Sequence, residues 1–392
     1  MPRKDHILNL PGFAIKKVSH SHSPLVLDVN YRRLPRCGHC QSKRVRKKDS
    51  FIRKVRHESL GHRQTILRFK AYKLYCHDCQ RYSNQQFPGI GKYQRATQRL
   101  HKQIFYQHTE GISQQSLSRN FKVGKATIER WYHKEYQLAY QEIKQPILPT
   151  LLGIDEHFFS KKQGFVTTLC DLRKHKIVDL VPGRCQQTLG KYLEQLTGRD
   201  RVKVICMDLS RTYRKIVQHY FPNAKIVADR FHVVRLLNHS CLQTYQQLDP
   251  KIKYQRGILA ALRTRMDNLT TKRRLKRETY LAQQPAIAAI DHFRQRLHRL
   301  LLKKQCTAKR CKRLLPIFIK MLANLKQSPL KHLKTLGKTL HEWREEIVRM
   351  WRFTKNNGIT EGFHRKMKLI QRRAYGFRNF ENYRLRVKVL CS

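Results

Sequence analysis

The sequence predicts an α/β fold with a mixed sheet, preceded by a small cysteine-containing module and a helical module, and interrupted by an all-α insertion. Three observations lead to this prediction. Two Cys-x-x-Cys pairs lie before residue 80, a helical pattern with a glycine-containing turn follows, and strand-like apolar runs alternate with helical ones beyond Pro149. Such alternation is typical of a sheet with helices on its faces.

The chain carries a large excess of positive charge. Lys and Arg number 83 against 26 Asp and Glu, a formal net charge of +57 spread over the whole length. An apolar content of 40% is ample for buried cores, so a disordered protein is not expected. A solvated surface is the simplest interpretation of excess charge, but a compact domain with this much like charge repels itself unless a polyanion neutralises it. Nucleic acid is therefore the expected partner.

The sequence contains no run of about 18 apolar residues, so we expect no membrane association. Its first residues, MPRKDHILNLPGF, lack the apolar region and the cleavage site of a secretory signal. The expected location is the cytoplasm, with the nucleoid. In that reducing compartment the 11 cysteines are not expected to form disulfide bonds.

Four cysteines have the spacing of ligands to a structural zinc ion. Cys37 and Cys40 form one Cys-x-x-Cys pair, and Cys76 and Cys79 form a second. Two such pairs supply the four thiolates of a closed tetrahedral zinc site. The intervening residues 41–75 exceed the usual spacer of about 15–20 residues, so they must contain a hairpin of their own. The alternative interpretation is four unrelated buried thiols.

Residues 99–140 fit a helix-turn-helix arrangement. Ser113 can cap one helix, and Thr127 lies at the start of the next, after a turn that contains Gly124. In a DNA-binding version the latter helix enters the major groove and presents Lys125, Thr127 and Arg130. An ordinary helical hairpin would show the same spacing, but the neighbouring cysteine pairs and the positive charge favour the DNA-binding version.

Beyond Pro149, two apolar runs end in an aspartate. They lead to Asp155 and to Asp208. Further strands are expected at 164–172, 176–181 and 224–229, with helices at 189–196 and 211–220. A carboxylate at the end of a buried strand is costly unless a cation receives it, so a metal ion is expected. Mg²⁺ or Mn²⁺ suits hard oxygen ligands, and two such ions about 3.5–4 Å apart are common in phosphodiester chemistry.

Longer motifs make the chain similar to a known family. They are Gly-Ile-Asp-Glu at 153–156, the run at 207–214, Asp-Arg-Phe-His-Val-Val at 229–234, and two blocks at 361–364 and 375–380. With the four cysteines and the helix-turn-helix, they resemble the ISL3 family of bacterial insertion-sequence transposases over nearly the whole chain. The resemblance implies a ribonuclease-H-like fold in which Asp155, Asp208 and Glu361 are the catalytic, metal-binding carboxylates.

Glu361 also fits a functional position by its surroundings. Residues 356–358 predict a turn, Thr360 can cap a helix, and Phe363 and Met367 share one face of it. Glu361 then lies in the first turn, where the helix dipole favours an anion. The alternative is that Glu361 serves the dipole alone.

Asp229 and His232 form an Asp-x-x-His step directly after the last predicted strand. We expect this pair to support the site by orienting it or a phosphate, without being catalytic. A purely structural histidine is the alternative. Glu156 is expected to point to the opposite face of its strand from Asp155.

The predicted organisation has five segments. They are a zinc-binding DNA-recognition module at 1–95, a helix-turn-helix at 96–148, the first part of the ribonuclease-H-like core at 149–238, a helical insertion at 239–355, and the C-terminal core helix with the glutamate at 356–392.

The predicted function is a DNA transposase that binds terminal inverted repeats and performs two-metal strand cleavage and strand transfer. Its expected partners are double-stranded DNA, as transposon ends and target, and further copies of itself on DNA. Two alternatives remain. One is a sequence-specific DNA-binding protein with an inactive core, and the other is a structure-specific nuclease that shares the carboxylates but needs no N-terminal reader.

Overall fold

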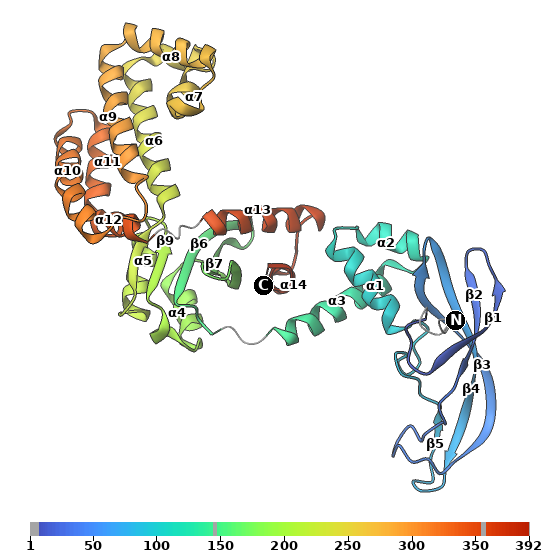
Figure 1. Ribbon diagram of the computed structural model, residues 1–392. Helices are drawn as coiled ribbons and strands as arrows, with labels where there is room; N and C mark the ends of the chain where they lie inside the picture. Colours follow the sequence, from blue (N-terminus) through green and yellow to red (C-terminus); the bar gives the residue numbers. More distant parts are fainter. Residues whose placement is uncertain (1–7, 144–146, 354–357, 392) are drawn as a thin grey trace. The chain divides into compact units, whose positions relative to one another are not determined.

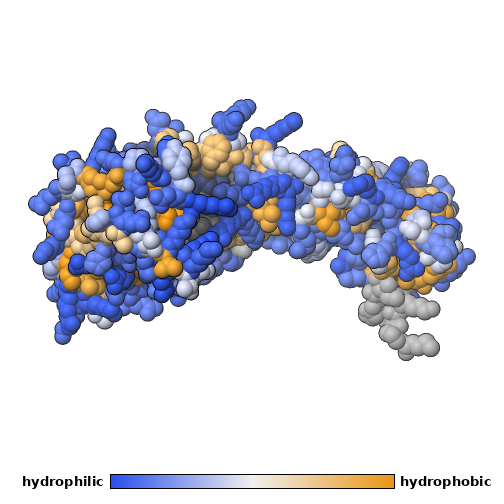
Figure 2. Space-filling model, turned by 90° about the horizontal axis from the view of Figure 1, so that it is seen from above, coloured by the Kyte–Doolittle hydropathy of each residue, from blue (hydrophilic) through white to orange (hydrophobic). Residues whose placement is uncertain are grey.

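The computed structural model describes residues 8–143, 147–353 and 358–391, and of residues 358–361 it describes the backbone alone. The chain divides into two compact units, one comprising residues 1–142 with 373–376 and the other residues 143–372 with 377–392. The face of the molecule in Figure 2 is mostly hydrophilic, with small separate hydrophobic patches, in keeping with the net charge of +57. No helix within the described ranges is both long and apolar enough to cross a membrane.

The first unit contains a five-stranded sheet in which the order is β1-β2-β4-β3 and β5 pairs with β4 (Figure 1). The strands are β1 Phe13–His20, β2 Leu25–Tyr31, β3 Val45–Leu60, β4 Arg63–Cys76 and β5 Tyr82–Asn84. Alternate residues of β2 and β4 are buried, so Leu27, Leu67 and Phe69 pack on one face of the sheet. β3 and β4 form a hairpin inside the cysteine interval, as predicted, and Gly61 supplies the positive φ of its turn.

Three helices follow this sheet: α1 Gln98–Thr109, α2 Gln114–Phe121 and α3 Lys125–Glu142. Ser113 caps α2 as predicted, because its hydroxyl accepts a hydrogen bond from the Ser116 N–H. Leu117 and Ile128 are fully buried where α2 packs on α3. α3 begins at Lys125, so Thr127 lies inside its first turn and not at its start.

The second unit contains a sheet of order β10-β9-β6-β7-β8. The strands are β6 Leu151–Ser160, β7 Gly164–Asp171, β8 Lys176–Pro182, β9 Val204–Met207 and β10 Lys225–Ala228. β10, β9 and β6 are parallel, whereas β6, β7 and β8 are antiparallel, so the sheet is mixed as predicted. Helices α4 Gln186–Glu194 and α5 Arg211–Tyr220 pack on one face, and α13 Gly358–Arg373 and α14 Phe380–Cys391 pack on the other.

Asp155 does not lie at the end of its strand, contrary to the prediction. β6 continues to Ser160 because it turns back into β7, where Asp155 pairs with Thr168. Only the pairing with β9 stops early, since it covers Leu151 to Ile154. Asp155 is therefore the first residue beyond the parallel part of the sheet.

A buried ionic cluster holds α14 against β8. Asp179 on β8 is 2% exposed and accepts hydrogen bonds from Arg384 at 2.8 and 2.7 Å, from Lys388 at 3.1 Å and from Tyr192 at 2.6 Å. Burial raises the pKa of Asp179, but Arg384 and Lys388 outweigh it, so the pKa lies below its usual value.

The insertion between β10 and α13 is helical, as predicted (Figure 1). Its elements are α6 Arg230–Leu248, α7 Ile258–Arg263, α8 Thr271–Gln283, α9 Pro285–Leu301, α10 Ala308–Gln327, α11 Lys331–Glu342 and α12 Arg344–Arg352. Arg230, the first residue of α6, is buried and donates hydrogen bonds to the carbonyls of Leu301, Lys303 and Met350. One side chain thus ties the start of the insertion to the ends of α9 and α12.

Candidate functional site

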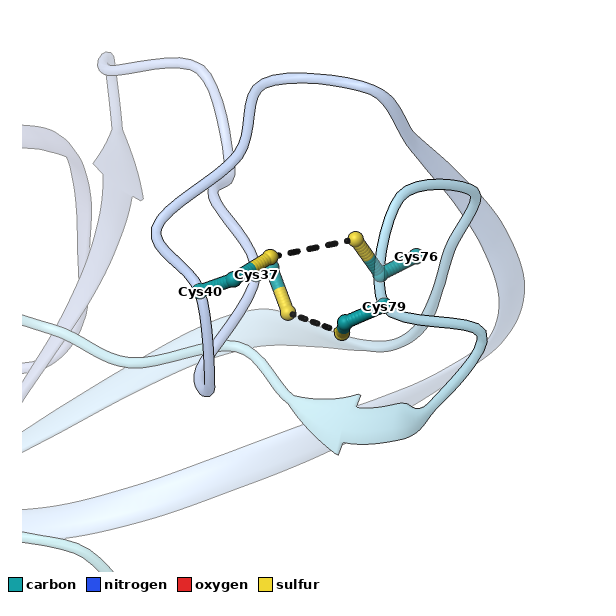
Figure 3. Close-up of side chains that lie close together, drawn as sticks. All are labelled: Cys37, Cys40, Cys76 and Cys79. Atoms are coloured by element: carbon teal, nitrogen blue, oxygen red, sulfur yellow. Dashed lines mark hydrogen bonds between the residues drawn. The ribbon is translucent and has the colours of Figure 1, made fainter.

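The four cysteines of the first unit converge in the structure (Figure 3). The Sγ atoms of Cys37 and Cys79 are 3.5 Å apart, as are those of Cys40 and Cys76. All four sulfurs lie within 4.8 Å of one another. A tetrahedral ion with Zn–S bonds of about 2.3 Å would place its sulfurs about 3.8 Å apart, so the cluster fits zinc closely.

The backbone around Cys37 favours a thiolate. Burial raises the pKa of the Cys37 thiol. Hydrogen bonds from the backbone N–H groups of Cys40 and His39 outweigh this effect, so the pKa falls below its usual value to about 6. A group that is easily deprotonated suits a ligand to a cation, since zinc binds thiolates and not thiols.

In the second unit, the carboxylates of Asp155 and Asp208 meet the ring of His232, with their ligand atoms all within 4.8 Å. Asp208 follows the last residue of β9, and Asp229 follows the last residue of β10. Because β6, β9 and β10 are parallel and adjacent, Asp155, the first residue beyond the part of β6 that pairs with β9, lies level with the carboxyl ends of β9 and β10.

His232 lies between two of the carboxylates. Its Nδ1 atom is 2.7 Å from Asp208 Oδ1 and 2.7 Å from Asp229 Oδ2. The Nδ1–H group of His232 donates to Asp229 Oδ2 and lies equally close to Asp208 Oδ1, a buried oxygen that has no other polar partner among the described residues. Burial lowers the pKa of His232, but Asp208 and Asp229 outweigh it and raise the pKa to about 10.

Asp155 is the most strongly perturbed acid of the group. It is 5% exposed, and burial together with the charge of Asp208 raises its pKa to about 7, although the Glu156 N–H donates to it. A buried carboxyl whose pKa is raised by a neighbouring carboxylate is what a divalent cation would stabilise. The residues present therefore fit the implied metal.

Helix α13 brings a second histidine to Asp155. His364 Nδ1 is 3.7 Å from Asp155 Oδ2, and the His364 ring lies 5.3 Å from that of His157. Sequence reasoning missed His364, although its position three residues after Glu361 places both on one face of a helix. Glu361 belongs to the first turn of α13, but its side chain lies outside what the structure describes, as do residues 356 and 357 of the predicted turn. Because α13 already includes Gly358, Thr360 lies inside the helix and does not cap its start, contrary to the prediction.

The predicted DNA-contact residues share the N-terminal turns of α3. Lys125 and Arg130 are exposed, and Arg130 Nη2 donates to Thr127 Oγ1 at 3.1 Å. Neither cation forms an ion pair with a carboxylate among the described residues, and the hydrogen bond to Thr127 fixes the direction of the Arg130 guanidinium.

Glu156, in the other unit, contacts Tyr213 of α5, whereas Asp155 contacts His364 of α13. These neighbouring residues therefore point to opposite faces of the sheet, as predicted.

Three family models match successive parts of the chain. A zinc finger of insertion-sequence transposases of the IS204/IS1001/IS1096/IS1165 type matches residues 33–79. The helix-turn-helix domain of transposase family ISL3 matches residues 85–136, and the ISL3 transposase domain matches residues 152–387.

A curated relative covers almost the same span. The chain is 25% identical over 370 residues to the transposase for insertion sequence element IS1001 of Bordetella parapertussis, which covers 90% of this chain and 87% of that protein. The transposase domain alone accounts for more than half of the sequence. The chain with the sulfur cluster, the helix-turn-helix and the converging carboxylates is thus an enzyme and belongs to the ISL3 family of transposases.

Proposed function

We propose that this transposase cleaves and joins DNA at a site formed by Asp155, Asp208 and Glu361, which hold two Mg²⁺ or Mn²⁺ ions. The observation that supports this proposal is the convergence of Asp155 and Asp208 at one sheet edge, with the pKa of Asp155 raised to about 7. Such ions activate the attacking oxygen and stabilise the leaving oxygen of a phosphodiester.

Asp155 and Asp208 have complementary positions on the sheet. Asp155 is held within β6, and its Oδ1 accepts the Glu156 N–H at 2.8 Å, which leaves Oδ2 for a cation. Asp208 lies on the loop between β9 and α5, and its buried Oδ1 lies 2.7 Å from the Nδ1 atom of His232.

Asp229 and His232 support this site. Asp229 caps α6, because its side chain accepts the Phe231 N–H, and its other oxygen fixes the His232 ring. The ring in turn limits where the Asp208 carboxylate can move. We assign Glu361 the third ligand position, since it lies on α13 one turn before His364, and His364 contacts Asp155.

The first unit is proposed to recognise the terminal inverted repeats of the element. Zinc bound by Cys37, Cys40, Cys76 and Cys79 would stabilise the loops at the end of the β3–β4 hairpin. The N-terminal turns of α3 would place Lys125, Thr127 and Arg130 in the major groove.

Cleavage at both ends and joining to a target require more than one active site near the DNA. We therefore propose that the transposase acts as a homo-oligomer on DNA, in the cytoplasm with the nucleoid.

The test is an Asp208→Ala variant assayed on DNA that carries the inverted repeats flanking its own gene. Strand cleavage and strand transfer with Mg²⁺ should be abolished, while binding to the repeats stays at the wild-type level. Asp267→Ala is the matched control, because Asp267 is an exposed aspartate of the insertion. Loss of repeat binding together with cleavage would contradict the metal-ligand assignment, since it would make Asp208 a folding residue.

A further inference from the structure

Two phenylalanine rings lie exposed on the hairpin of β6 and β7, and Asp155 lies on the first of these strands. Phe158 on β6 and Phe165 on β7 are directly paired across the strands, and their side chains are 52% and 37% exposed. Their ring centroids are 5.7 Å apart at an angle of 77°, so one ring presents its edge to the other. Most large apolar side chains of this sheet are buried, whereas these two form an apolar surface that is exposed to solvent.

The cationic side chain of Arg184 lies beside these two rings. The guanidinium carbon of Arg184 lies 4.8 Å from the centroid of the Phe165 ring, and Arg184 Nη1 lies 3.4 Å from Glu156 Oε1. The Arg184 side chain is still 60% exposed, so its remaining N–H groups face solvent. We call Phe158, Phe165 and Arg184 the β6–β7 patch.

Hydrogen bonds to α5 hold the base of the β6–β7 patch. The Tyr213 hydroxyl lies 3.5 Å from Glu156 Oε2 and 2.9 Å from Thr167 Oγ1. Thr167 in turn donates to the Gly183 carbonyl at 2.8 Å, directly before Arg184. The guanidinium is therefore positioned by a network and is not an isolated surface side chain.

The β6–β7 patch and Asp155 share strand β6 but lie on opposite faces of the sheet. Phe158 is three residues after Asp155, about 10 Å along an extended strand, and its side chain lies on the face of Glu156. Stacked nucleotides of a duplex rise by about 3.4 Å each, so this distance spans about three stacked nucleotides and fewer unstacked ones. The pairing of β6 with β9 ends at Ile154, so residues 155–158 have no β9 partner on the side where a bound strand would cross between the two faces.

The charges around the patch favour a polyanion. Lys161 and Lys162 are exposed at the tip of the β6–β7 hairpin, and together with Arg184 they exceed the charge of Glu156. Exposed aromatic rings bordered by cations are the combination that binds unpaired nucleotides, because the rings stack bases and the cations contact phosphates.

We propose that the β6–β7 patch binds an unpaired nucleotide of the cleaved DNA strand, up to about three nucleotides from the cleaved phosphate. A base stacks on Phe158 and Phe165, and Arg184 contacts the neighbouring phosphate. This inference rests on the proposed function only in that it takes the reacting phosphate to lie at Asp155 and Asp208.

The test is photocrosslinking of the full-length protein to a single-stranded oligothymidine that carries one 5-iodouracil, in buffer without Mg²⁺ or Mn²⁺. The crosslinked peptide should contain Phe158 or Phe165. The double variant Phe158→Ala/Phe165→Ala should lower the yield of this crosslink by about fivefold to a hundredfold, the range expected for loss of base stacking. The variant Phe158→Leu/Phe165→Leu keeps apolar area without a π face and should also lose the crosslink, even if the alanine variant fails to fold.

Tyr254→Ala is the matched control, because Tyr254 is 79% exposed and Lys253 lies 5.0 Å above its ring, yet it belongs to the insertion. That variant should leave the crosslink at Phe158 unchanged. The proposal would be overturned if crosslinks mapped only to residues outside the β6–β7 patch. It would also be overturned if the double alanine variant kept the crosslink but lost self-association in the absence of DNA. No cleavage takes place without Mg²⁺ or Mn²⁺, so the crosslink reports on the β6–β7 patch alone. A failure of the proposed cleavage site would leave the crosslink unchanged, whereas a failure of the patch would remove it.

Discussion

Replacing Asp155 by asparagine should stabilise the metal-free protein. Burial and the neighbouring Asp208 raise the pKa of Asp155 from 3.8 to about 7. Each pKa unit corresponds to about 1.4 kcal/mol, so an ionised Asp155 lowers the free energy of unfolding by about 4 kcal/mol. Asparagine keeps an oxygen for the Glu156 N–H and removes the charge.

The effect has a defined pH dependence. Below about pH 4 the carboxyl is protonated in both the folded and the unfolded chain, so Asp155 costs nothing there. Between about pH 4 and pH 7 the unfolded chain releases the proton while the folded chain retains it, so the wild type loses stability as pH rises. Above about pH 7 the loss is complete. The difference between Asp155→Asn and wild type should therefore grow across this window and then level off.

Urea unfolding followed by tryptophan fluorescence measures this difference, because Trp343 and Trp351 are fully buried in the second unit. In EDTA at pH 8 the variant should unfold at higher urea than wild type. Mg²⁺ or Mn²⁺ at about a hundred times its dissociation constant should stabilise the wild type by about 2.7 kcal/mol and the variant far less. Equal stability of the two proteins in EDTA, or equal stabilisation by metal, would refute the electrostatic reasoning. Asp267→Asn serves as an exposed control.

Three further perturbations have expected outcomes. Asp179→Asn leaves the buried Lys388 and the partly buried Arg384 without their carboxylate. It should lower the free energy of unfolding by about 3–5 kcal/mol in urea titrations, whereas Glu381→Gln, an exposed control, should change it by less than about 1 kcal/mol. A strong zinc chelator should increase hydrogen exchange at residues 37–79 and abolish DNA binding by the full chain; unchanged exchange would argue against zinc. Arg130→Ala should reduce the slope of log affinity against log salt for repeat DNA by about 1, and an unchanged slope would remove Arg130 from the interface.

The sequence predicted the sulfur cluster, and it predicted the succession of strands and helices along the chain of the second unit, because both depend on local patterns. Two Cys-x-x-Cys pairs need only a hairpin between them to meet, and β3 and β4 provide it. The short apolar run Val204–Met207 has the length and the flanking residues of a buried strand, and it forms β9. The predicted end of β6 was wrong. Polar residues after Asp155 interrupt the apolar run, but the strand continues because it pairs with β7, and this pairing depends on residues outside the run itself.

Contacts across long distances in the chain explain what the sequence could not predict. His364 reaches Asp155 only because α13 packs on the sheet after an insertion of more than a hundred residues. The proximity of His232 to both Asp208 and Asp229 likewise requires β9 and β10 to be neighbours. The Asp-x-x-His spacing indicated a pair, but it did not indicate the third partner.

The side chain of Arg230 has a consequence for how this enzyme can vary in evolution. It binds carbonyls at the end of α9 and at the end of α12, so the chain leaves the core and returns to it at nearly the same point. The length of the segment between these points does not change the distance that the core must bridge, and longer loops add little closure entropy. Helices could be gained, lost or exchanged within the insertion while the carboxylates stay in register, so relatives that differ in size should differ there first.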